Sequence, residues 1–208
     1  ERSVVVVATA DEPATVRVKA ALVATRIAAA FRRTGRHVLL LMDSLTRVAM
    51  AQREIGLVAG EPPTTKGYTP SVFSLLSQVL ERAGTDEQGS VTGLYTVLVE
   101  GDDMGDPIAD SARSVLDGHV VLSRRLAHRH HYPAIDVLQS VSRLLPEVTT
   151  VAHRKAQARI REWMAAYADV DELLQLGAYV PGQVPVADEA IDRMPEIIRF
   201  LRQPAEEG

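Results

Sequence analysis

The 208-residue chain contains no cysteine, which excludes a disulfide framework and a thiolate metal site. Nothing in it points to an oxidising compartment, so we expect a cytoplasmic protein. It also lacks an apolar run approaching the roughly 20 residues that span a bilayer, and we expect no transmembrane segment. The formal net charge is only −4, so no basic field covers the whole molecule, and the sequence argues against nucleic acid as a partner.

What is present in the N-terminal part is a pattern of strand, helix and strand. Ser3 to Ala8 is rich in valine and predicts a strand. Behind it, apolar residues recur every three or four positions as far as Gly35, which predicts a helix that ends at this glycine. His37 to Met42 is a continuous apolar run, as expected of a parallel strand covered on both faces. Together these elements predict a βαβ unit.

The remaining sequence alternates further and then changes character. Strands are predicted over 91–99, 119–123 and 134–138, and helices over 44–55, 71–82, 151–176 and 188–201. After Pro146 the strand pattern disappears and the helices become amphipathic and charged. We therefore expect an α/β fold with a mostly parallel sheet over residues 1–148, followed by a small helical C-terminal domain over 149–208.

The strand predicted at His37 ends in an acidic residue, Asp43. Ligands of open α/β sheets bind outside the carboxyl ends of the strands. An apolar strand that ends in aspartate is typical of the Walker B motif of nucleoside triphosphatases, in which the carboxylate holds Mg²⁺, usually through water, beside the β and γ phosphates. The alternative is that Asp43 only caps the helix that begins at Ser44.

Two further clusters invite a metal-site interpretation that the sequence does not support. The acidic loop EGDDMGDPIAD lacks the ligand spacing of a calcium loop and reads better as a solvated loop with helix-start carboxylates. His128, His130 and His131 lie among arginines without a fixed ligand spacing. We interpret these histidines as an exposed basic helix end.

Longer motifs connect the chain to a known family. They are, in order, RSVVVVATADEP, LLLMDSLTRVAMAQREIGLVAGEPPTTKGYTPSVF, YTVLVEGDDMGDPIAD, LDGHVVLSR and HYPAIDVLQSVSR. In this order and spacing they resemble the ATPases of type III protein export, and more distantly the catalytic subunits of rotary F- and V-type ATPases. The wording AMAQREIG and EPPTTKGY resembles the flagellar branch more than the injectisome branch, which stays open as an alternative.

One family motif is missing. The P-loop pattern G-x-x-x-x-G-K-[ST], whose amides and lysine cradle the phosphates, does not occur in the chain. The resemblance also lacks the N-terminal β-barrel and the glutamate that activates the attacking water. It therefore implies the second part of a RecA-like ATPase domain plus the C-terminal domain, a fragment that we expect to be inactive alone.

The resemblance assigns roles to particular residues. Asp43 matches the carboxylate that holds Mg²⁺ through water, and Arg47 matches an arginine near the γ-phosphate of ATP. Arg143 matches the arginine finger that reaches into a neighbouring subunit's nucleotide. Tyr132 matches the tyrosine on which adenine stacks, and Tyr179 is a further candidate for closing that pocket.

Each assignment has a plainer alternative. Arg47 could form a surface ion pair with Glu54, and Arg143 could be an ordinary surface arginine. An isolated Tyr-Pro such as Tyr132 would more often belong to a core at a strand entrance. The loop from Gly60 to Pro70 matches a family loop that faces the central pore, where a coiled-coil stalk protein inserts, but it could equally be a flexible surface loop.

The resemblance implies an ATP hydrolase that works as a homohexameric ring, with Mg²⁺ as cofactor. Its partners would be the stalk protein, export substrates and their chaperones, and it would lie in the cytoplasm, peripheral to the membrane export gate. A rival hypothesis is an inert interaction module that contacts export substrates and chaperones, favoured by the missing P-loop. A second rival is a rotary ATP synthase or vacuolar-type subunit, against which GEPPTTKGY argues.

Overall fold

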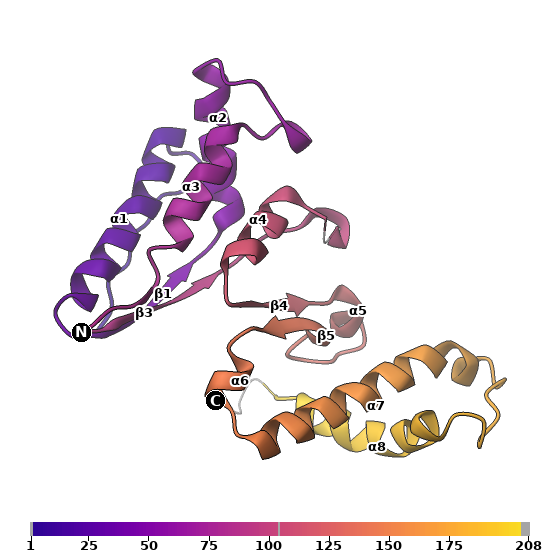
Figure 1. Ribbon diagram of the computed structural model, residues 1–208. Coiled ribbons are helices and arrows are strands. Elements are labelled where there is room, and N and C mark those ends of the chain that lie inside the picture. The colour runs from indigo at the N-terminus through magenta and orange to yellow at the C-terminus, as the bar shows by residue number, and fades with distance from the viewer. Residues whose placement is uncertain (1, 104, 205–208) are drawn as a thin grey trace. The chain divides into compact units, whose positions relative to one another are not determined.

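The computed structural model describes residues 2–103 and 105–204 and forms two compact units, Glu1–Leu116 and Asp117–Gly208. Figure 1 shows the helices and strands along the chain. The first unit contains α1 (Ala14–Arg32), β1 (His37–Met42), α2 (Leu45–Val58), a 3-10 turn η1 (Thr65–Gly67), α3 (Pro70–Leu80), β2 (Gly84–Thr85), β3 (Ser90–Tyr95), a second 3-10 turn η2 (Glu100–Asp102) and α4 (Pro107–Val115).

The sheet of the first unit is built on one parallel pair. β1 and β3 run side by side from His37 opposite Ser90 to Met42 opposite Tyr95. The short β2 pairs antiparallel with β3 at the other edge. The carboxyl ends of β1 and β3 therefore lie next to each other, which is where an open α/β sheet places its ligands. The predicted α/β class is confirmed.

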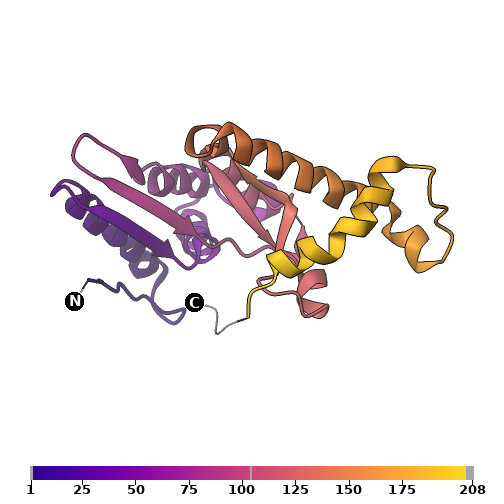
Figure 2. The same cartoon turned by 90° about the horizontal axis from the view of Figure 1, so that it is seen from below.

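Helices α1, α2 and α3 pack together with β1 and bury the apolar core of the first unit. Its fully buried large side chains include Leu45, Val72, Leu76, Val79 and Ile108. Figure 2, seen from below, looks onto the side of β1 and β3 that these helices leave open. The predicted helices over 44–55 and 71–82 correspond to α2 and α3, with ends shifted by a few residues.

Coverage of β1 on both faces was expected from its continuous apolar run, and this prediction is wrong. Burial alternates along the strand, and Leu39 and Leu41 are 60% and 68% exposed. Leu94 on the neighbouring strand is exposed as well. A run of apolar residues shows that both faces can be covered, but the described helices of this unit pack on one face only.

The strand predicted over Ser3 to Ala8 is also wrong. These residues form neither helix nor strand, and Val5 and Val7 are largely exposed. Valine favours the extended backbone, but a strand exists only where a partner completes its hydrogen-bond ladder. Among the described residues, none forms such a ladder with this segment.

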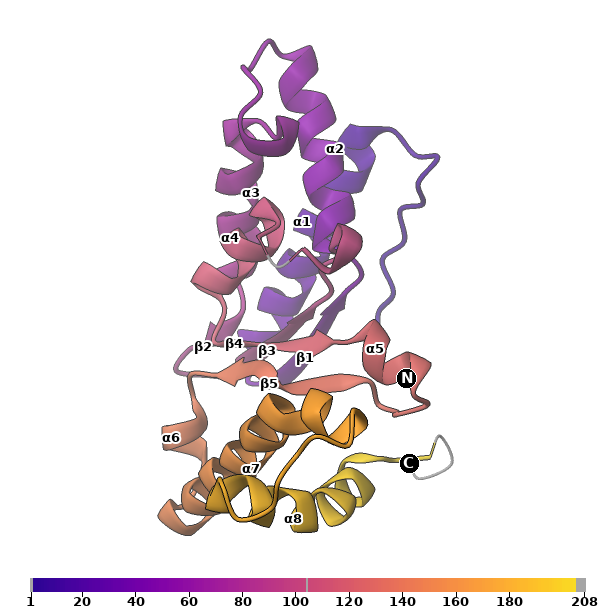
Figure 3. The same cartoon turned by 90° about the vertical axis from the view of Figure 1, so that its right-hand side faces the viewer.

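The second unit contains β4 (Gly118–Leu122), α5 (Arg124–His128), β5 (Ile135–Ser142), α6 (Leu145–Val148), α7 (Val151–Gln175) and α8 (Pro185–Leu201). The strands β4 and β5 form a two-stranded antiparallel sheet with an interrupted register. In Figure 3, α7 and α8 lie side by side beneath β5. The short helices α5 and α6 were not predicted as elements of their own.

The predicted domains and the compact units divide the chain differently. The units follow packing, so that β4 and β5 belong with α7 and α8. The predicted domains, 1–148 and 149–208, follow sequence character, and that division stays a prediction. None of the helices in the described part of the chain combines the length and the apolar character that a bilayer crossing needs.

The histidine cluster is only partly what the sequence predicts. His128 and His130 are exposed, as expected, but His131 is buried at 7% exposure. Burial lowers the pKa of His131 because the charged imidazolium loses solvation, and the nearby charge of Arg202 lowers it further. His131 is therefore a buried histidine that favours its neutral form.

Candidate functional site at the carboxyl end of β1

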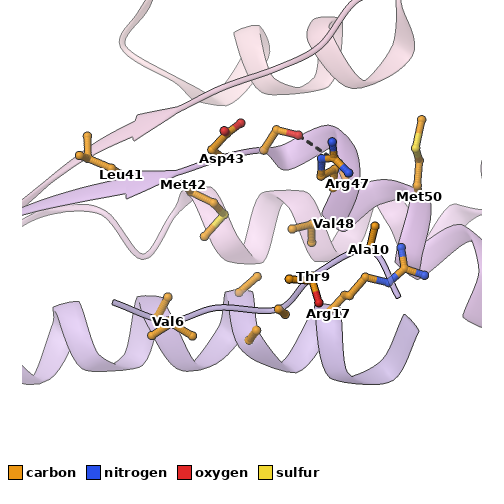
Figure 4. A pocket seen from close by; sticks show the side chains of 15 residues that line it. Val6, Thr9, Ala10, Arg17, Leu41, Met42, Asp43, Arg47, Val48 and Met50 are labelled. Atoms are coloured by element: carbon orange, nitrogen blue, oxygen red, sulfur yellow. Dashed lines mark hydrogen bonds between the residues drawn. The ribbon is translucent and has the colours of Figure 1, made fainter. Parts of the chain in front are cut away.

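Asp43 follows the last residue of β1 and lies beside the residue that follows β3, Thr96. The Thr96 hydroxyl donates a hydrogen bond to Oδ1 of Asp43 at 2.6 Å. Two backbone hydrogen bonds also join these strand ends. The Thr96 amide donates to the Met42 carbonyl at 3.0 Å, and the Leu45 amide donates to the Thr96 carbonyl at 2.9 Å. In Figure 4, the Asp43 side chain leaves the strand on the side opposite to Met42. Two strand ends thus hold and orient one exposed carboxylate.

The Asp43 carboxylate does not cap α2. The N-cap of this helix is Ser44, whose hydroxyl accepts from the Arg47 amide at 3.4 Å. That bond is the dashed line in Figure 4. Since Ser44 caps α2, the alternative that Asp43 serves only as the helix cap loses its support, and the Asp43 carboxylate remains available to a ligand.

The chemistry of Asp43 fits one kind of metal site. Magnesium prefers oxygen ligands and usually keeps several waters, so that one or two carboxylates plus substrate phosphates suffice. Asp43 offers such an oxygen, because in the described part of the chain Oδ2 accepts no hydrogen bond. Within that same part, no group of three or more acidic, histidine or cysteine side chains could hold a metal by itself. The site therefore fits a magnesium ion that arrives with a nucleotide.

Arg47 lies on the first turn of α2 and lines the same cavity as Asp43. This cavity has a volume of about 370 Å³ and is bounded by residues 6–10, α1, the end of β1 and α2. The predicted alternative partner of Arg47, Glu54, pairs instead with Arg17 at 2.9 Å. Arg47 is exposed, and none of the carboxylates in the described ranges pairs with it. The cavity is therefore lined by a cation and an anion that lie four residues apart in the sequence.

Tyr132 and Arg143 lie at opposite ends of β5. Tyr132 precedes the strand and is 53% exposed, so it is not a core residue at a strand entrance. Its carbonyl accepts a hydrogen bond from the Gln203 amide at 2.9 Å. Arg143 is exposed and follows the strand, and its amide donates to the Asp117 carbonyl at 2.7 Å. The length of β5 therefore separates Tyr132 from Arg143.

Tyr179 lies in the loop between α7 and α8. Its hydroxyl donates to Oδ1 of Asp188 at 2.9 Å, and Oδ2 of Asp188 accepts from the Gly182 amide at 2.9 Å. Partial burial raises the pKa of Tyr179, and the Asp188 carboxylate adds to that effect. Asp188 thus ties this loop to the first turn of α8, which gives Tyr179 a structural role whether or not it also meets a ligand.

The loop before α3 makes polar contacts with neighbouring segments. The Lys66 ammonium lies 2.6 Å from Oδ2 of Asp103 and 3.7 Å from Oδ2 of Asp106. The hydrogen bond to Asp103 raises the pKa of Lys66 and lowers that of Asp103. The Arg53 guanidinium lies over the Tyr68 ring, 5.7 Å from its centroid. These contacts link the loop to neighbouring segments, and its pore-facing role stays a prediction.

The structure brings together some of the predicted residues. Asp43 and Arg47 line one cavity of the first unit, whereas Tyr132, Arg143 and Tyr179 belong to the second unit. Thr96 is the residue that sequence analysis missed. The available signal was its position, because a hydroxyl at the end of a predicted neighbouring strand lies where ligands of such sheets gather.

Comparisons with known proteins agree with this geometry. Residues 1–142 match the ATP synthase alpha/beta family, nucleotide-binding domain. Residues 149–208 match the T3SS EscN ATPase C-terminal domain. The first match includes Asp43, Thr96 and both strands that hold them.

Individual relatives come from two branches. A flagellum-specific ATP synthase of Bacillus subtilis is 54% identical over 207 residues, which are 100% of this chain and 47% of that protein. The SPI-2 type 3 secretion system ATPase of Salmonella typhimurium is 55% identical over 207 residues, covering 100% of this chain and 48% of the relative. The chain thus spans about half the length of the curated relatives it matches.

A solved structure is similar across nearly the whole chain. The assembled ATPase EscN from the type III secretion system of enteropathogenic E. coli has a TM-score of 0.92 and 48% sequence identity, over 96% of this chain and 48% of EscN. The chain therefore belongs to the ATP synthase alpha/beta family, with the C-terminal region of its type III secretion ATPases.

Proposed function

We propose that this chain is part of an ATPase that energises protein export through the flagellar type III apparatus, hydrolysing ATP at the subunit interfaces of a ring. The observation that carries the proposal is the Asp43 carboxylate at the paired ends of β1 and β3, oriented by Thr96 and not used for capping. It lies within the region that matches a nucleotide-binding domain.

In the proposed mechanism the chain's own residues position and stabilise charge. Asp43 would hold Mg²⁺ through bound water, and Thr96 fixes the direction of its carboxylate. The Mg²⁺ ion, when bound with ATP, neutralises charge on the β and γ phosphates. Arg47 lies near the γ-phosphate, and Tyr132 supplies a flat ring for adenine, with Tyr179 as a second candidate for closing that pocket. None of these residues forms a covalent bond in the reaction.

Arg143 has a different task in this proposal. Its guanidinium is planar and permanently charged, which suits a transition state whose charge is spread over phosphoryl oxygens. Since a strand separates it from Tyr132, we assign Arg143 to the nucleotide of a neighbouring subunit. Each active site is then shared between two copies of the chain.

The ring and its partners are part of the proposal. One related structure is described as the assembled EscN ATPase, and another as EscN in complex with its central stalk EscO. We extend this to a homohexamer that receives a stalk protein near the loop around Lys66. Export substrates and chaperones are the further proposed partners, at the cytoplasmic side of the membrane export gate.

The choice of the flagellar branch rests on two short sequence motifs. Relatives of both branches have 54% to 55% identity to the chain, so overall identity does not separate them. The motifs AMAQREIG and EPPTTKGY favour the flagellar branch. A role in an injectisome remains the alternative, and complementation of a flagellar-export-deficient strain distinguishes the two.

A chimeric ATPase tests the proposed activity. It joins the part of the Bacillus subtilis relative that lies outside the matched 207 residues to this chain. We expect the chimera to hydrolyse ATP in a Mg²⁺-dependent manner, and Arg143→Ala to lower kcat by at least about a hundredfold with little change in KM. Arg193→Ala, on the exposed side of α8, is the matched control and should leave both constants unchanged. Parental kcat in Arg143→Ala would refute the finger role.

A further inference from the structure

The strand β5 contains a bulge just before Arg143. The β4–β5 register pairs Val121 with Asp136 and then His119 with Val141. Residues 137–140 of β5 therefore stand opposite a single residue of β4. Such an insertion removes backbone groups from the ladder, so their carbonyls need other partners.

One arginine satisfies most of these carbonyls. The Arg161 guanidinium, projecting from the middle of α7, donates to the Leu138 carbonyl at 2.8 Å, to the Ser140 carbonyl at 3.3 Å and also to the Val137 carbonyl. The remaining carbonyl, that of Gln139, lies 3.0 Å from the His119 ring. Arg161 is partly buried, and in the described ranges no carboxylate pairs with it. In that part of the chain, the hydrogen-bond partners of its guanidinium are thus the carbonyls of the bulge.

The bulge is also braced from within. The Asp136 carboxylate accepts from the Gln139 amide at 3.1 Å and from its side-chain amide at 2.9 Å. The Ser140 hydroxyl donates to the Asp136 carbonyl at 2.6 Å and accepts from the Val121 amide at 3.0 Å. Side-chain hydrogen bonds, and not the ladder, therefore hold the bulge in this conformation.

Among the described residues, the β4–β5 ladder beyond the bulge is short. Only two ladder positions, His119 with Val141 and Gly118 with Ser142, remain before the chain reaches Arg143. The Arg143 amide then donates to the Asp117 carbonyl. A change in the bulge thus shifts the short segment that presents the Arg143 side chain.

We propose that Arg161 is a positioning residue for Arg143: by holding the β5 bulge it fixes the strand end that carries the finger, and it ties that strand end to α7. This inference rests on the proposed function of Arg143. Arg161 belongs to the region that matches the EscN C-terminal domain, whereas the bulge belongs to the nucleotide-binding region. A partner that moves α7 would therefore also move the finger.

The first test measures the positioning itself, by amide hydrogen exchange in this chain. Arg161→Gln removes the guanidinium fork and should accelerate exchange of the amides of residues 136–143 by about tenfold, because charge-assisted hydrogen bonds are lost. The matched control is Arg159→Gln on the same helix, since Arg159 pairs with Glu162 and Glu189 and not with β5. The control should change this exchange less than twofold.

A conservative variant protects the test against misfolding. Arg161→Lys keeps the charge but not the planar fork, so it should give an intermediate acceleration. If Arg161→Gln does not fold, Arg161→Lys is the variant to measure. Unchanged exchange of residues 136–143 in the folded variant would overturn the proposal.

The second test measures the consequence in the chimeric ATPase. With kcat referred to the concentration of folded, nucleotide-binding rings, so that a loss of folded protein does not count, Arg161→Gln should lower kcat roughly tenfold and keep KM for ATP within twofold of the parental value. In a double-mutant cycle, adding Arg161→Gln to Arg143→Ala should change kcat less than twofold. Arg161 affects kcat through the Arg143 guanidinium, which Arg143→Ala has already removed.

The outcomes separate this inference from the proposed function. If Arg143→Ala is slow and Arg161→Gln loosens β5 without lowering kcat, Arg161 does not position the finger. If the two losses in kcat multiply independently, the same conclusion follows. If Arg143→Ala is as fast as the parent, the finger role fails, and faster exchange in Arg161→Gln would then establish only that Arg161 holds β5.

Discussion

The hydroxyl of Thr96 offers the most direct perturbation of the proposed Mg²⁺ site. Thr96→Val removes the donor to Asp43 but keeps the shape of the side chain. The backbone bonds of Thr96 to Met42 and Leu45 do not involve the hydroxyl, so the strand end should stay in place. The substitution therefore tests the orientation of the carboxylate and little else.

The expected magnitude follows from the setting of this hydrogen bond. Bonds to charged groups contribute roughly 1.5–3 kcal/mol when buried. Asp43 and Thr96 are both exposed, so water replaces part of the loss, and we expect about 1 kcal/mol, which is about fivefold in an equilibrium constant. Thr96→Val should raise the Mg²⁺ concentration for half-maximal binding of nucleotide by the chimera about fivefold.

The assay is titration of Mg²⁺ at fixed ATP, followed by fluorescence of a bound nucleotide analogue and by hydrolysis rate. Thr96→Ser keeps a hydroxyl and is the matched control, with an expected change of less than twofold. A parental Mg²⁺ requirement in Thr96→Val would refute the reasoning, as would an equal loss in the serine and valine variants.

Three further predictions concern stability and the isolated chain. Leu76 is fully buried, so Leu76→Ala should lower the free energy of unfolding by about 2–5 kcal/mol in denaturant titration, whereas Val58→Ala, at an exposed site, should change it by no more than about 0.5 kcal/mol. Because burial and Arg202 depress the pKa of His131, the unfolded state binds the extra proton; stability should be complete above about pH 6.5 and fall as the pH drops below it, and His131→Asn should flatten that slope. A slope as steep in His131→Asn as in the parent would contradict this. The chain alone should bind Mg-ATP far more weakly than a dissociation constant in the low micromolar range, as calorimetry can check, because it has no P-loop to bind the phosphates.

Local patterns predicted the elements that depend on local physics. The apolar repeat up to Gly35 predicted α1, and the apolar run from His37 predicted β1, because the period and the length of an apolar pattern can be seen in the sequence itself. The failure at Ser3 to Ala8 has the opposite origin. Its valines favour extended backbone, but a hydrogen-bond ladder also needs a partner strand, and the sequence of the segment does not show whether one is present.

The candidate site was predictable to the same extent. Asp43 follows from its place at a strand end, and its distinction from a helix cap required the observation that Ser44 caps α2. The position of Thr96 at a strand end was a signal, but the contacts that Thr96 and Arg161 make could not be predicted, because they cross 53 and more than 20 positions of sequence. The Arg161 contacts also depend on a bulge, which appears only when the register of β4 and β5 is known.

The measurement that tests the central claim most directly mixes two inactive variants of the chimeric ATPase. Asp43→Asn disables the Mg²⁺ site of its own subunit, and Arg143→Ala disables the finger offered to a neighbour. In mixed rings, some interfaces pair an intact Mg²⁺ site with an intact finger, so ATP hydrolysis should return to a fraction of the parental rate that depends on the mixing ratio. Mixed rings that form, as verified by differently tagged subunits, but hydrolyse no more ATP than either variant alone would contradict an active site shared between Asp43 and the Arg143 of a neighbour.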